Sequence, residues 1–325
     1  MPPDIIKKTV VFAGYRCNNN CRFCMEADKR DLPVRGTAVI KGELKSARER
    51  GSDYIEIIGG EAAMRSDITS IISYAKDLGF STIMMATNGR MFSYPELTKR
   101  LIDAGLNSLV FSIHGADAET HDYLTRSPGS FDQLIVGMEN VKNAAIISGA
   151  RISLGSNTCI VKDNYRQLPA ISELIASSGV GNSEFIFVDC NEGGAKNSFD
   201  ELVPKISDAA PYMRECLDIG NRNKADHWDV RYVPLCYFPD HLNRISELHE
   251  AKTFHTEHIA QDFVNTDAQS GRKNVGRRKS RRCSECILDP WCEGIWRTYI
   301  SRYGDDELIP ITELTVGQKE MLDGL

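Results

Sequence analysis

Short apolar runs alternate with helical patterns along the first 190 residues of the chain. Six β-prone runs predict strands at Thr9–Ala13, Tyr54–Ile58, Thr82–Ala86, Ser108–Ile113, Arg151–Ile160 and Glu184–Val188. The stretches between them carry apolar residues at helical spacing and predict helices at Ala38–Arg50, Asp67–Leu78, Tyr94–Ala104, Phe131–Ser148 and Asn164–Ser177. Several of these helices are followed by a glycine, as helix C-termini often are: Gly51, Gly79, Gly105, Gly149 and Gly179.

Strands separated by helices imply a parallel sheet whose connections are right-handed crossovers. Six such units are too few for a closed barrel of eight, so we predict an α/β fold with an open, partial (β/α)6 TIM-like barrel. After residue 195 the alternation stops: one more helix is predicted at Leu202–Asn221, and a less regular region follows. We place a domain boundary near residue 225, with the barrel in residues 1–224 and a second region in residues 225–325. In such folds the chemistry lies at the carboxyl ends of the strands.

Composition and charge narrow the class of protein. Of the 325 residues, 42% are apolar and 26% are charged, which is typical of a globular chain with a sizeable core. We find no run of eighteen apolar residues, and the segment MPPDIIKK lacks the apolar stretch of a signal peptide, so we expect a cytoplasmic protein without a membrane partner. The net charge of −6 argues against nucleic-acid binding by the surface as a whole.

The chain has ten cysteines, and most of them are grouped. Cytoplasmic thiols are kept reduced, so disulfide bonds are not expected, and closely spaced cysteines favour metal or cluster ligation. Six of them form two groups with short spacing: Cys17, Cys21 and Cys24, then Cys283, Cys286 and Cys292. The other four stand alone: Cys159, Cys190, Cys216 and Cys236.

The first group lies in the segment GYRCNNNCRFC, directly after the first predicted strand. Cys17, Cys21 and Cys24 are separated by three and then two residues, a spacing that lets one irregular loop reach three irons of a four-iron cluster. Three ligands leave the fourth iron open to a small molecule that binds by its amino and carboxylate groups. The alternative interpretation of this spacing is a zinc loop or an isolated redox loop.

The Cys-x3-Cys-x2-Cys pattern after the first strand resembles the radical S-adenosylmethionine (radical SAM) superfamily, and the resemblance covers about residues 8–190. It implies a 4Fe-4S cluster on Cys17, Cys21 and Cys24, with S-adenosyl-L-methionine at the open iron. The family has an aromatic residue just before the third cysteine. Here that residue is Phe23, which the resemblance places against the adenine of the cofactor.

Further strand ends match cofactor motifs of the same family. The segment IIGGEAAMRSD resembles its Gly-Gly-Glu motif, which implies that Gly59, Gly60 and Glu61 hold the methionyl ammonium group. The family usually has proline next, whereas this chain has Ala62. Polar residues on three more strands complete the expected cofactor contacts: Asn88, Ser112 and Asn157. Each of these is weak evidence alone, because strand ends are often polar for turn or cap reasons, but their joint placement is informative.

The resemblance implies a radical mechanism. One electron from the reduced cluster cleaves a carbon–sulfur bond of the cofactor, giving methionine and a 5′-deoxyadenosyl radical that removes a hydrogen atom from an unactivated carbon. The cofactor carries this chemistry, while the protein positions the substrate and excludes water. An electron donor such as flavodoxin or ferredoxin is the expected protein partner.

The second group lies in RRCSECILDPWCEG, with the spacing Cys-x2-Cys-x5-Cys, and one further cysteine lies upstream in VPLCYF. Four thiolates suffice for one cluster or for one tetrahedral zinc ion. The run resembles the auxiliary-cluster domains of the superfamily called SPASM or, when shortened, twitch; a full SPASM run has one more cysteine where this chain has Trp296. We expect one auxiliary 4Fe-4S cluster in a small C-terminal iron–sulfur domain, ligated by Cys236, Cys283, Cys286 and Cys292.

Several residues are left without assigned chemistry. Cys159, Cys190 and Cys216 are by default buried structural cysteines. Cys190 follows the sixth strand, and because we expect it to point toward the barrel mouth, it is also a candidate hydrogen donor to a substrate radical. His114 and His121 lie near the end of the fourth strand and are candidate site residues without a defined role.

The segment 271–282 is strongly basic, with seven lysines and arginines in residues 272–282. We expect an exposed loop. Its charge is explained by solvation alone, by a counter-charge for an anionic cluster, or by a lip that binds an anionic substrate.

Three classes of function follow. The first, which we favour for a short chain with one auxiliary cluster, is an enzyme that oxidises, epimerises or rearranges a small polar metabolite. The second is a peptide-modifying enzyme that acts on a ribosomal precursor peptide. The third is a non-catalytic iron–sulfur electron carrier, which would not need cofactor motifs at five strand ends.

Overall fold

The computed structural model describes residues 5–225 and 227–324, so the first four residues of MPPDIIKK lie outside the described residues. Its centre is a nine-stranded sheet in the order β7-β6-β5-β4-β3-β2-β1-β8-β9. Neighbouring strands pair in parallel, except that β9 is antiparallel to β8. The strands are β1 (Ile6–Phe12), β2 (Tyr54–Ile58), β3 (Thr82–Thr87), β4 (Ser108–Ser112), β5 (Ser153–Ile160), β6 (Asn182–Phe187), β7 (His227–Arg231), β8 (Phe254–Ile259) and β9 (Val264–Asn265).

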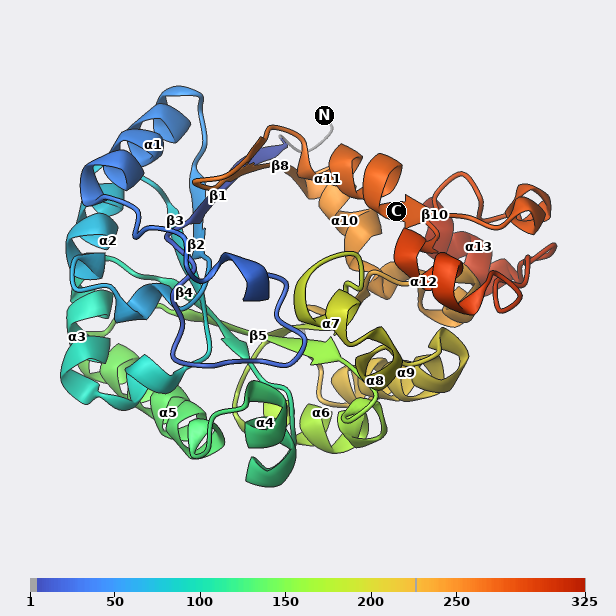
Figure 1. The fold of residues 1–325 in the computed structure, drawn as a ribbon, viewed down its shortest axis with the longest axis horizontal. Coiled ribbons are helices and arrows are strands. Elements are labelled where there is room, and N and C mark those ends of the chain that lie inside the picture. The colour runs from blue at the N-terminus through green and yellow to red at the C-terminus, as the bar shows by residue number, and fades with distance from the viewer. Residues whose placement is uncertain (1–4, 226, 325) are drawn as a thin grey trace.

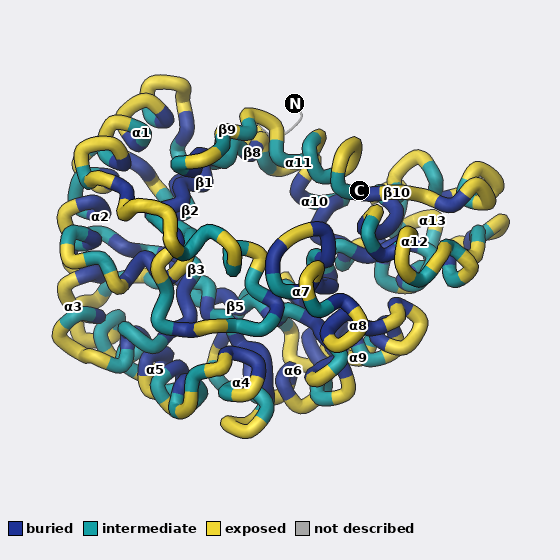
Figure 2. The backbone as a smooth tube through the Cα atoms, in the orientation of Figure 1, coloured by how far each residue is buried: buried dark blue, intermediate teal, exposed yellow. Residues whose placement is uncertain are grey.

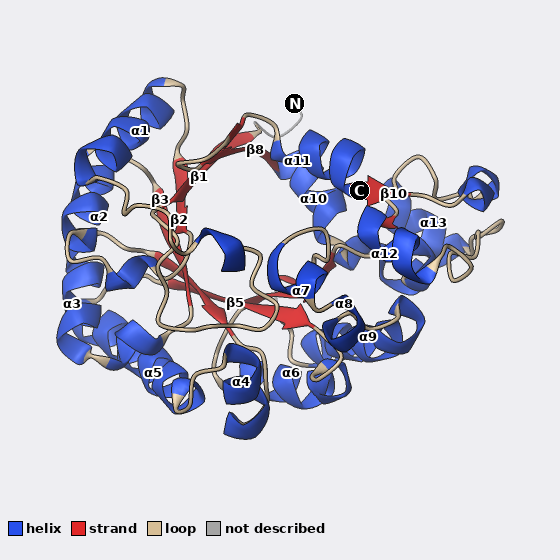
Figure 3. Ribbon diagram, in the orientation of Figure 1, coloured by secondary structure: helices blue, strands red, loops and turns tan. Residues whose placement is uncertain are grey.

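Helices follow most of the strands and cover the outer face of the curved sheet, as Figure 3 shows. They are α1 (Thr37–Glu49), α2 (Ile68–Asp77), α3 (Pro95–Ala104), α4 (Ala118–Thr125), α5 (Ser130–Ser148), α6 (Leu168–Ser177), α7 (Gly193–Asn197), α8 (Phe199–Leu202), α9 (Ile206–Arg222), α10 (Ser246–Thr253), α11 (Ala268–Gly271), α12 (Arg297–Tyr303) and α13 (Val316–Asp323). The expected glycine termini are present; Gly105 ends α3 with φ +119° and Gly149 ends α5 with φ +66°. Within the described residues, no helix is long and apolar enough to cross a membrane.

The open, mostly parallel sheet confirms the predicted fold class, but it contains more than six strands. β7 continues the sheet beyond β6, and β8 pairs with β1, so the chain returns to its own N-terminal strand (Figure 1). The prediction that the alternation stops after residue 195 is therefore wrong. β7 (HWDVR) and β8 (FHTEHI) lack apolar runs because the inner side of this part of the sheet carries charged groups such as Arg231. The division of the chain at residue 225 stays a prediction.

Most of the central strands are buried on one face and partly buried on the other. On β1, Val11 belongs to the main core between sheet and helices, whereas Val10 and Phe12 pack in a second cluster with Tyr15. Figure 2 shows the buried strands surrounded by helices whose outer surfaces are exposed. The partly buried face carries polar side chains such as Glu56 and Glu184 between the apolar ones.

The basic segment after α11 is folded rather than an exposed loop. A short π-helix covers Arg272–Gly276, and β10 (Arg277–Arg278) pairs antiparallel with β11 (Ile295–Trp296). The side chain of Arg272 is ion-paired with Glu293 at 2.8 Å, and that of Arg277 is fully buried. The expectation of an exposed loop is wrong for these two arginines, because carboxylates and aromatic rings from distant segments enclose them.

Candidate iron–sulfur and cofactor site

The loop with the first three cysteines follows β1 and crosses the carboxyl end of the sheet (Figure 1). Burial, and then the neighbouring Cys17 and Cys24, raises the pKa of the Cys21 thiol to about 12. Burial also raises the pKa of Cys17. Thiols that oppose one another's ionisation lie close together, and their deprotonated forms need a positive centre, which iron supplies. The donor set therefore fits an iron–sulfur cluster.

Two other elements hold the cysteine loop by its backbone. The N–H groups of Asn20 and Arg22 donate to carbonyl oxygens at the end of α4, both at 2.9 Å. On the other side, the N–H of Gly194 in α7 donates to the carbonyl oxygen of Cys24 at 2.8 Å. A Cβ atom at Gly194 would overlap the carbonyl oxygen of Arg22, so glycine is required there. Sequence reasoning missed this residue; the signal was the glycine pair after the sixth strand.

A second group missed by the sequence analysis is the guanidinium of Arg90, directly after the third strand. It donates to the carbonyl oxygen of Asn18 and, at 2.9 Å, to Oδ1 of Asn19. Arg30 donates to the carbonyl oxygen of Asn19 at 2.7 Å. These cations hold Asn18 and Asn19, in the part of the loop between the first two cysteines.

Gly59 and Gly60 let the loop after β2 lie directly against the cysteine loop. Both have positive φ, +90° and +52°. A Cβ atom at Gly60 would overlap the carbonyl oxygen of Arg16, and that oxygen accepts the N–H of Glu61 at 2.8 Å. The close approach thus explains why two glycines stand here.

The carboxylate of Glu61 is buried at the end of β3. It accepts the N–H of Asn88 at 2.7 Å and the hydroxyl of Thr87 at 2.9 Å. Burial raises the pKa of Glu61, and these hydrogen bonds oppose the rise. Glu61 therefore joins the ends of β2 and β3 beneath the cysteine loop.

Asn88 contacts the cysteine loop as well. Its side-chain amide donates to Oδ1 of Asn18 at 2.7 Å and approaches the sulfur of Cys17 at 3.6 Å. Ser112 and Asn157 are register partners on β4 and β5. Asn88 and Ser112 thus lie at the carboxyl ends of β3 and β4, and Asn157 lies beside Ser112 within β5.

Phe23 is buried and packs edge-on against His114, with ring centroids 4.7 Å apart. Nδ1 of His114 accepts the N–H of Cys159, and Nδ1 of His121 accepts the N–H of His114, both at 3.2 Å. Burial, and then the neighbouring His121, lowers the pKa of His114 to about 3. His114 is consequently neutral at pH 7, with its proton on Nε2.

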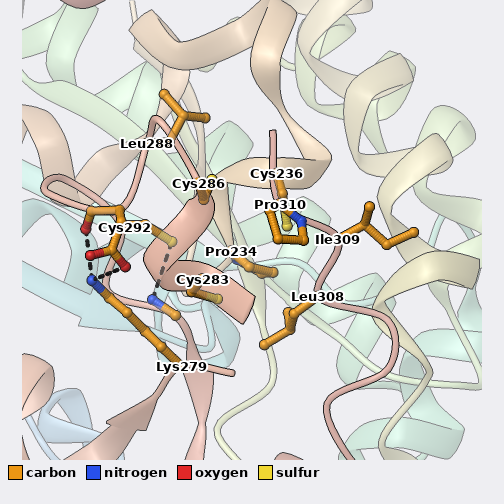
Figure 4. Close-up of a pocket in the computed structure, with 12 residues that line it drawn as sticks. Pro234, Cys236, Lys279, Cys283, Cys286, Leu288, Cys292, Leu308, Ile309 and Pro310 are labelled. Carbon is orange, nitrogen blue, oxygen red and sulfur yellow. Dashed lines mark hydrogen bonds and ion pairs between the residues drawn. The ribbon is translucent and has the colours of Figure 1, made fainter. Parts of the chain in front are cut away.

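The four cysteines predicted for the auxiliary site line one cavity (Figure 4). Its walls are largely apolar, including Pro234, Leu288 and Leu308. Burial, and then the thiols of the other three cysteines, raises the pKa of Cys236 to about 12. The structure therefore brings the isolated Cys236 to the C-terminal group.

Backbone N–H groups point at sulfur atoms around this cavity. Those of Leu235 and Gly294 donate to Cys292 at 3.5 and 3.3 Å, and that of Ile311 donates to Cys286 at 3.4 Å. Such donors stabilise thiolates and tune cluster potentials. Across the described residues, no group of three or more His, Cys, Asp or Glu is arranged to hold a metal ion. Four thiols around one cavity suit one iron–sulfur cluster or one tetrahedral zinc ion.

The remaining cysteines lie in different surroundings. Cys190 and Cys216 are fully buried in the hydrophobic core. The expectation that Cys190 points toward the barrel mouth, and its role as hydrogen donor, stay predictions. Cys159 faces the first cluster loop: burial, and then Cys21, raises the pKa of its thiol.

Comparisons with known proteins agree with this arrangement. A model of the Radical SAM superfamily matches residues 11–174. An AdoMet-dependent heme synthase of Methanosarcina barkeri is 30% identical over 191 residues, which cover 58% of this chain and 52% of that protein. A probable GTP 3′,8-cyclase of Saccharolobus solfataricus is 30% identical over 221 residues, 67% of this chain and 68% of that protein. The chain thus spans about half the length of the heme synthases that it matches.

Solved structures share the fold. SuiB of Streptococcus suis bound to S-adenosylmethionine has a TM-score of 0.66 at 16% identity, covering 93% of this chain and 75% of that one. The structure of anSMEcpe with bound AdoMet and Kp18Cys peptide has a TM-score of 0.65 at 12% identity, covering 98% and 95%. The family match over residues 11–174 and the arrangement of the cysteine loop lead to one conclusion: the chain belongs to the radical SAM superfamily.

Proposed function

We propose that this protein is a radical SAM enzyme with a 4Fe-4S cluster on Cys17, Cys21 and Cys24 and with S-adenosylmethionine as its cofactor. One observation carries the proposal: the cysteine loop lies directly on the Gly59–Gly60 turn, with Glu61 and Asn88 beneath it. This arrangement places thiols, a buried carboxylate and an aromatic ring at one edge of the sheet, where α/β folds bind their ligands.

When bound, the cluster and S-adenosylmethionine supply one electron and a 5′-deoxyadenosyl radical that abstracts a hydrogen atom. The chain's own residues bind and orient the cofactor. Glu61 holds the methionyl ammonium, and Phe23 packs against the adenine. Ser112 and Asn157, adjacent on β4 and β5, bind polar groups of the same cofactor. The neutral His114 packs edge-on against the Phe23 ring and holds it in place.

The substrate we propose is a small polar metabolite, which the enzyme oxidises, epimerises or rearranges. The relatives described above support it, since they are named for small molecules, heme and GTP. A peptide substrate is the second candidate. It is favoured by the solved structures of SuiB with the precursor peptide SuiA and of anSMEcpe with a peptide. The electron donor we propose is a flavodoxin or ferredoxin.

The decisive experiment is anaerobic incubation of the reconstituted protein with S-adenosylmethionine, dithionite and candidate metabolites or peptides. We expect 5′-deoxyadenosine by mass spectrometry, and its yield should rise with the true substrate. Cys21→Ala should abolish it, whereas Cys216→Ala, at a buried cysteine of α9 that belongs to neither group, should not. A protein that holds a cluster but never forms 5′-deoxyadenosine would be an electron carrier instead.

We further propose one auxiliary 4Fe-4S cluster on Cys236, Cys283, Cys286 and Cys292. The shared cavity and the backbone donors to sulfur support it. Reconstituted protein should contain about eight irons per chain, and Cys286→Ala should retain about four. Four irons and one zinc in the unaltered chain would mean that the second site is a structural zinc site.

A further inference from the structure

A row of polar residues crosses one face of the sheet from β4 to β7. Ser112 on β4 pairs in register with Asn157 on β5, and Asn157 pairs with Glu184 on β6. Glu184 in turn pairs with Asp229 on β7. Register partners on neighbouring strands point to the same face, and their backbones lie about 5 Å apart. Glu184 is therefore directly beside Asn157, which the proposed function assigns to the cofactor.

Burial shows that this row lies on the inner side of the sheet. The residues that alternate with Glu184 and Asp229 are buried, and two of them, Phe185 and Trp228, are in ring contact at 5.7 Å. A Cβ atom at Gly220 of α9 would overlap the Trp228 ring, so this buried face turns toward the outer helices. Side chains alternate between the two faces of a strand, so Glu184 and Asp229 point to the inner side.

Glu184 also acts on a residue of β2, across the inner side of the sheet. Burial raises the pKa of the Tyr54 hydroxyl, and the carboxylates of Glu56 and then Glu184 raise it further. Three strands separate β2 from β6 in the sheet, so the charge of Glu184 reaches Tyr54 across the concave side. A ligand group beside Glu184 would thus have protein on two sides.

Glu184 is one end of an ion-pair chain. Nη1 of Arg231 donates to Oε1 of Glu184 at 3.0 Å, and Nη2 of Arg231 donates to Glu250 at 2.8 Å. Glu250 also pairs with Arg272, whose guanidinium donates to both carboxylate oxygens of Glu293. The side chain of Glu293, at the other end, is 11% exposed, whereas that of Glu184 is 33% exposed. Glu184 is therefore the accessible end of the chain.

This chain has one carboxylate more than it has guanidiniums, since three carboxylates alternate with two arginines. Arg231 is engaged by carboxylates on both sides, so it is not free to bind a phosphate or carboxylate of a ligand. Lys8 on β1 is likewise paired with Glu56, at 3.2 Å. The excess negative charge is presented at Glu184, where a charge-assisted hydrogen bond from an ammonium group would continue the alternation of charges.

We infer that Glu184 binds a primary ammonium group of the substrate and holds the neighbouring carbon beside the cofactor contacts Ser112 and Asn157. The inference rests on the proposed function and narrows its substrate class to amines. A substrate that presents a carboxylate or phosphate at this point is disfavoured, because Glu184 repels it. Glu184 thus determines specificity, and Arg231 positions it.

The test compares three deuterated two-carbon probes: ethanolamine, a cation, ethylene glycol, which is neutral, and glycolate, an anion. The reconstituted protein is incubated with S-adenosylmethionine, dithionite and one probe, each at the same concentration. A deuterium atom taken from a probe carbon makes 5′-deoxyadenosine one mass unit heavier. We expect about tenfold more labelled product with ethanolamine than with glycolate, and an intermediate amount with ethylene glycol. Equal labelling by the three probes, or labelling by none, would refute the ammonium site.

Variants then assign the preference to its residue. Glu184→Gln should lower labelling by ethanolamine to the level of ethylene glycol. Glu173→Gln removes an exposed carboxylate of α6 and should keep the full preference. Glu184→Asp, which withdraws the charge by one methylene group, should lower the preference in part, and it replaces Glu184→Gln if that variant holds no cluster. A preference that position 184 does not alter would rule out the role of Glu184. If the unaltered protein forms no 5′-deoxyadenosine at all, the proposed function fails instead.

Discussion

The backbone N–H of Gly194 donates to the carbonyl oxygen of Cys24 at 2.8 Å, which joins the segment after β6 to the loop that begins after β1. These residues are 170 positions apart in the chain. The contact closes the cysteine loop on the side opposite α4. Because the loop has no regular secondary structure of its own around the cysteines, such contacts determine where its thiols lie.

Gly194→Ala should therefore weaken the first cluster. The added Cβ would overlap the carbonyl oxygen of Arg22 and press on the N–H of Cys24 at 3.2 Å, so the loop must shift. Overpacking of this kind costs about 1–3 kcal/mol. Iron analysis after reconstitution should give a content closer to four than to eight. Gly181→Ala, where a Cβ meets nothing within 4 Å, is the matched control and should retain all the iron. Equal iron in the two variants would show that the contact is not needed.

Glu61→Gln should weaken binding of S-adenosylmethionine while the cluster stays intact. The substitution keeps the side-chain shape, but it removes the charge proposed to hold the cofactor ammonium. Hydrogen bonds to charged groups contribute about 1.5–3 kcal/mol, so we expect a loss of about tenfold or more in affinity by equilibrium dialysis. Glu56→Gln, on β2 just before the Gly59–Gly60 turn and paired with Lys8, is the control. Unaltered affinity in Glu61→Gln would remove Glu61 from the cofactor site.

The paired histidines make stability depend on pH. Burial lowers the pKa of His114 to about 3 and, as the leading cause, that of His121 to about 4, whereas an unfolded histidine titrates near about 6.5. Below that value the unfolded chain binds protons that the folded chain does not. Their contribution to stability is therefore complete above about pH 6.5 and is lost as the pH falls toward the folded values. Each histidine contributes a slope of up to about 1.4 kcal/mol per pH unit in that window.

His121→Asn tests this slope. The asparagine side chain can still accept the N–H of His114, but it does not titrate. Urea unfolding of the cluster-free chain between pH 7 and pH 5 should show a shallower loss of stability than in the unaltered protein. His255→Asn, an exposed position, should keep the full slope. A slope that His121→Asn leaves unchanged would mean that His121 is protonated in the folded chain.

The sequence predicts those parts of the molecule whose signal is local. β1 to β6 are recognisable because each is a short β-prone run between helical patterns, and three cluster ligands are recognisable because Cys17, Cys21 and Cys24 lie in one loop. β7 and β8 were missed because charged residues such as Arg231 interrupt their apolar pattern. Gly194 and Arg90 were missed because they contact the cysteine loop from distant parts of the chain, where spacing carries no information.

The charge of the basic segment illustrates the same limit. Composition alone favours solvated lysines and arginines, and exposed Arg278 fits that reading. Whether an arginine is buried depends on which carboxylates the fold brings to it. Here Arg272 forms ion pairs with Glu250 from α10 and with Glu293, next to Cys292. No periodic pattern in the sequence predicts these ion pairs.

Arg272 is the centre of a buried ion-pair chain that links the barrel to the auxiliary site. It contacts both carboxylate oxygens of Glu293 at 2.8 and 3.0 Å and an oxygen of Glu250 at 2.9 Å, and Glu250 also contacts Arg231 at 2.8 Å. Burial opposes ionisation of Glu250, but Arg231 and Arg272 outweigh it and lower its pKa to about 2. Glu250 is therefore ionised at pH 7, and its low pKa depends on both arginines.

Arg272→Met should destabilise the protein strongly, because it leaves the carboxylate of Glu293 buried without its partner. Breaking a buried pair by removing one member costs about 3–5 kcal/mol, whereas replacing both members by apolar residues costs much less. In thermal unfolding, the double variant Arg272→Met with Glu293→Met should therefore melt above the single variant. Lys99→Met breaks the exposed pair with Asp103 and should not change the melting temperature. If Arg272→Met has the same melting temperature as the unaltered protein, the ion-pair chain contributes nothing to stability. The link between barrel and auxiliary site must then come from apolar packing alone.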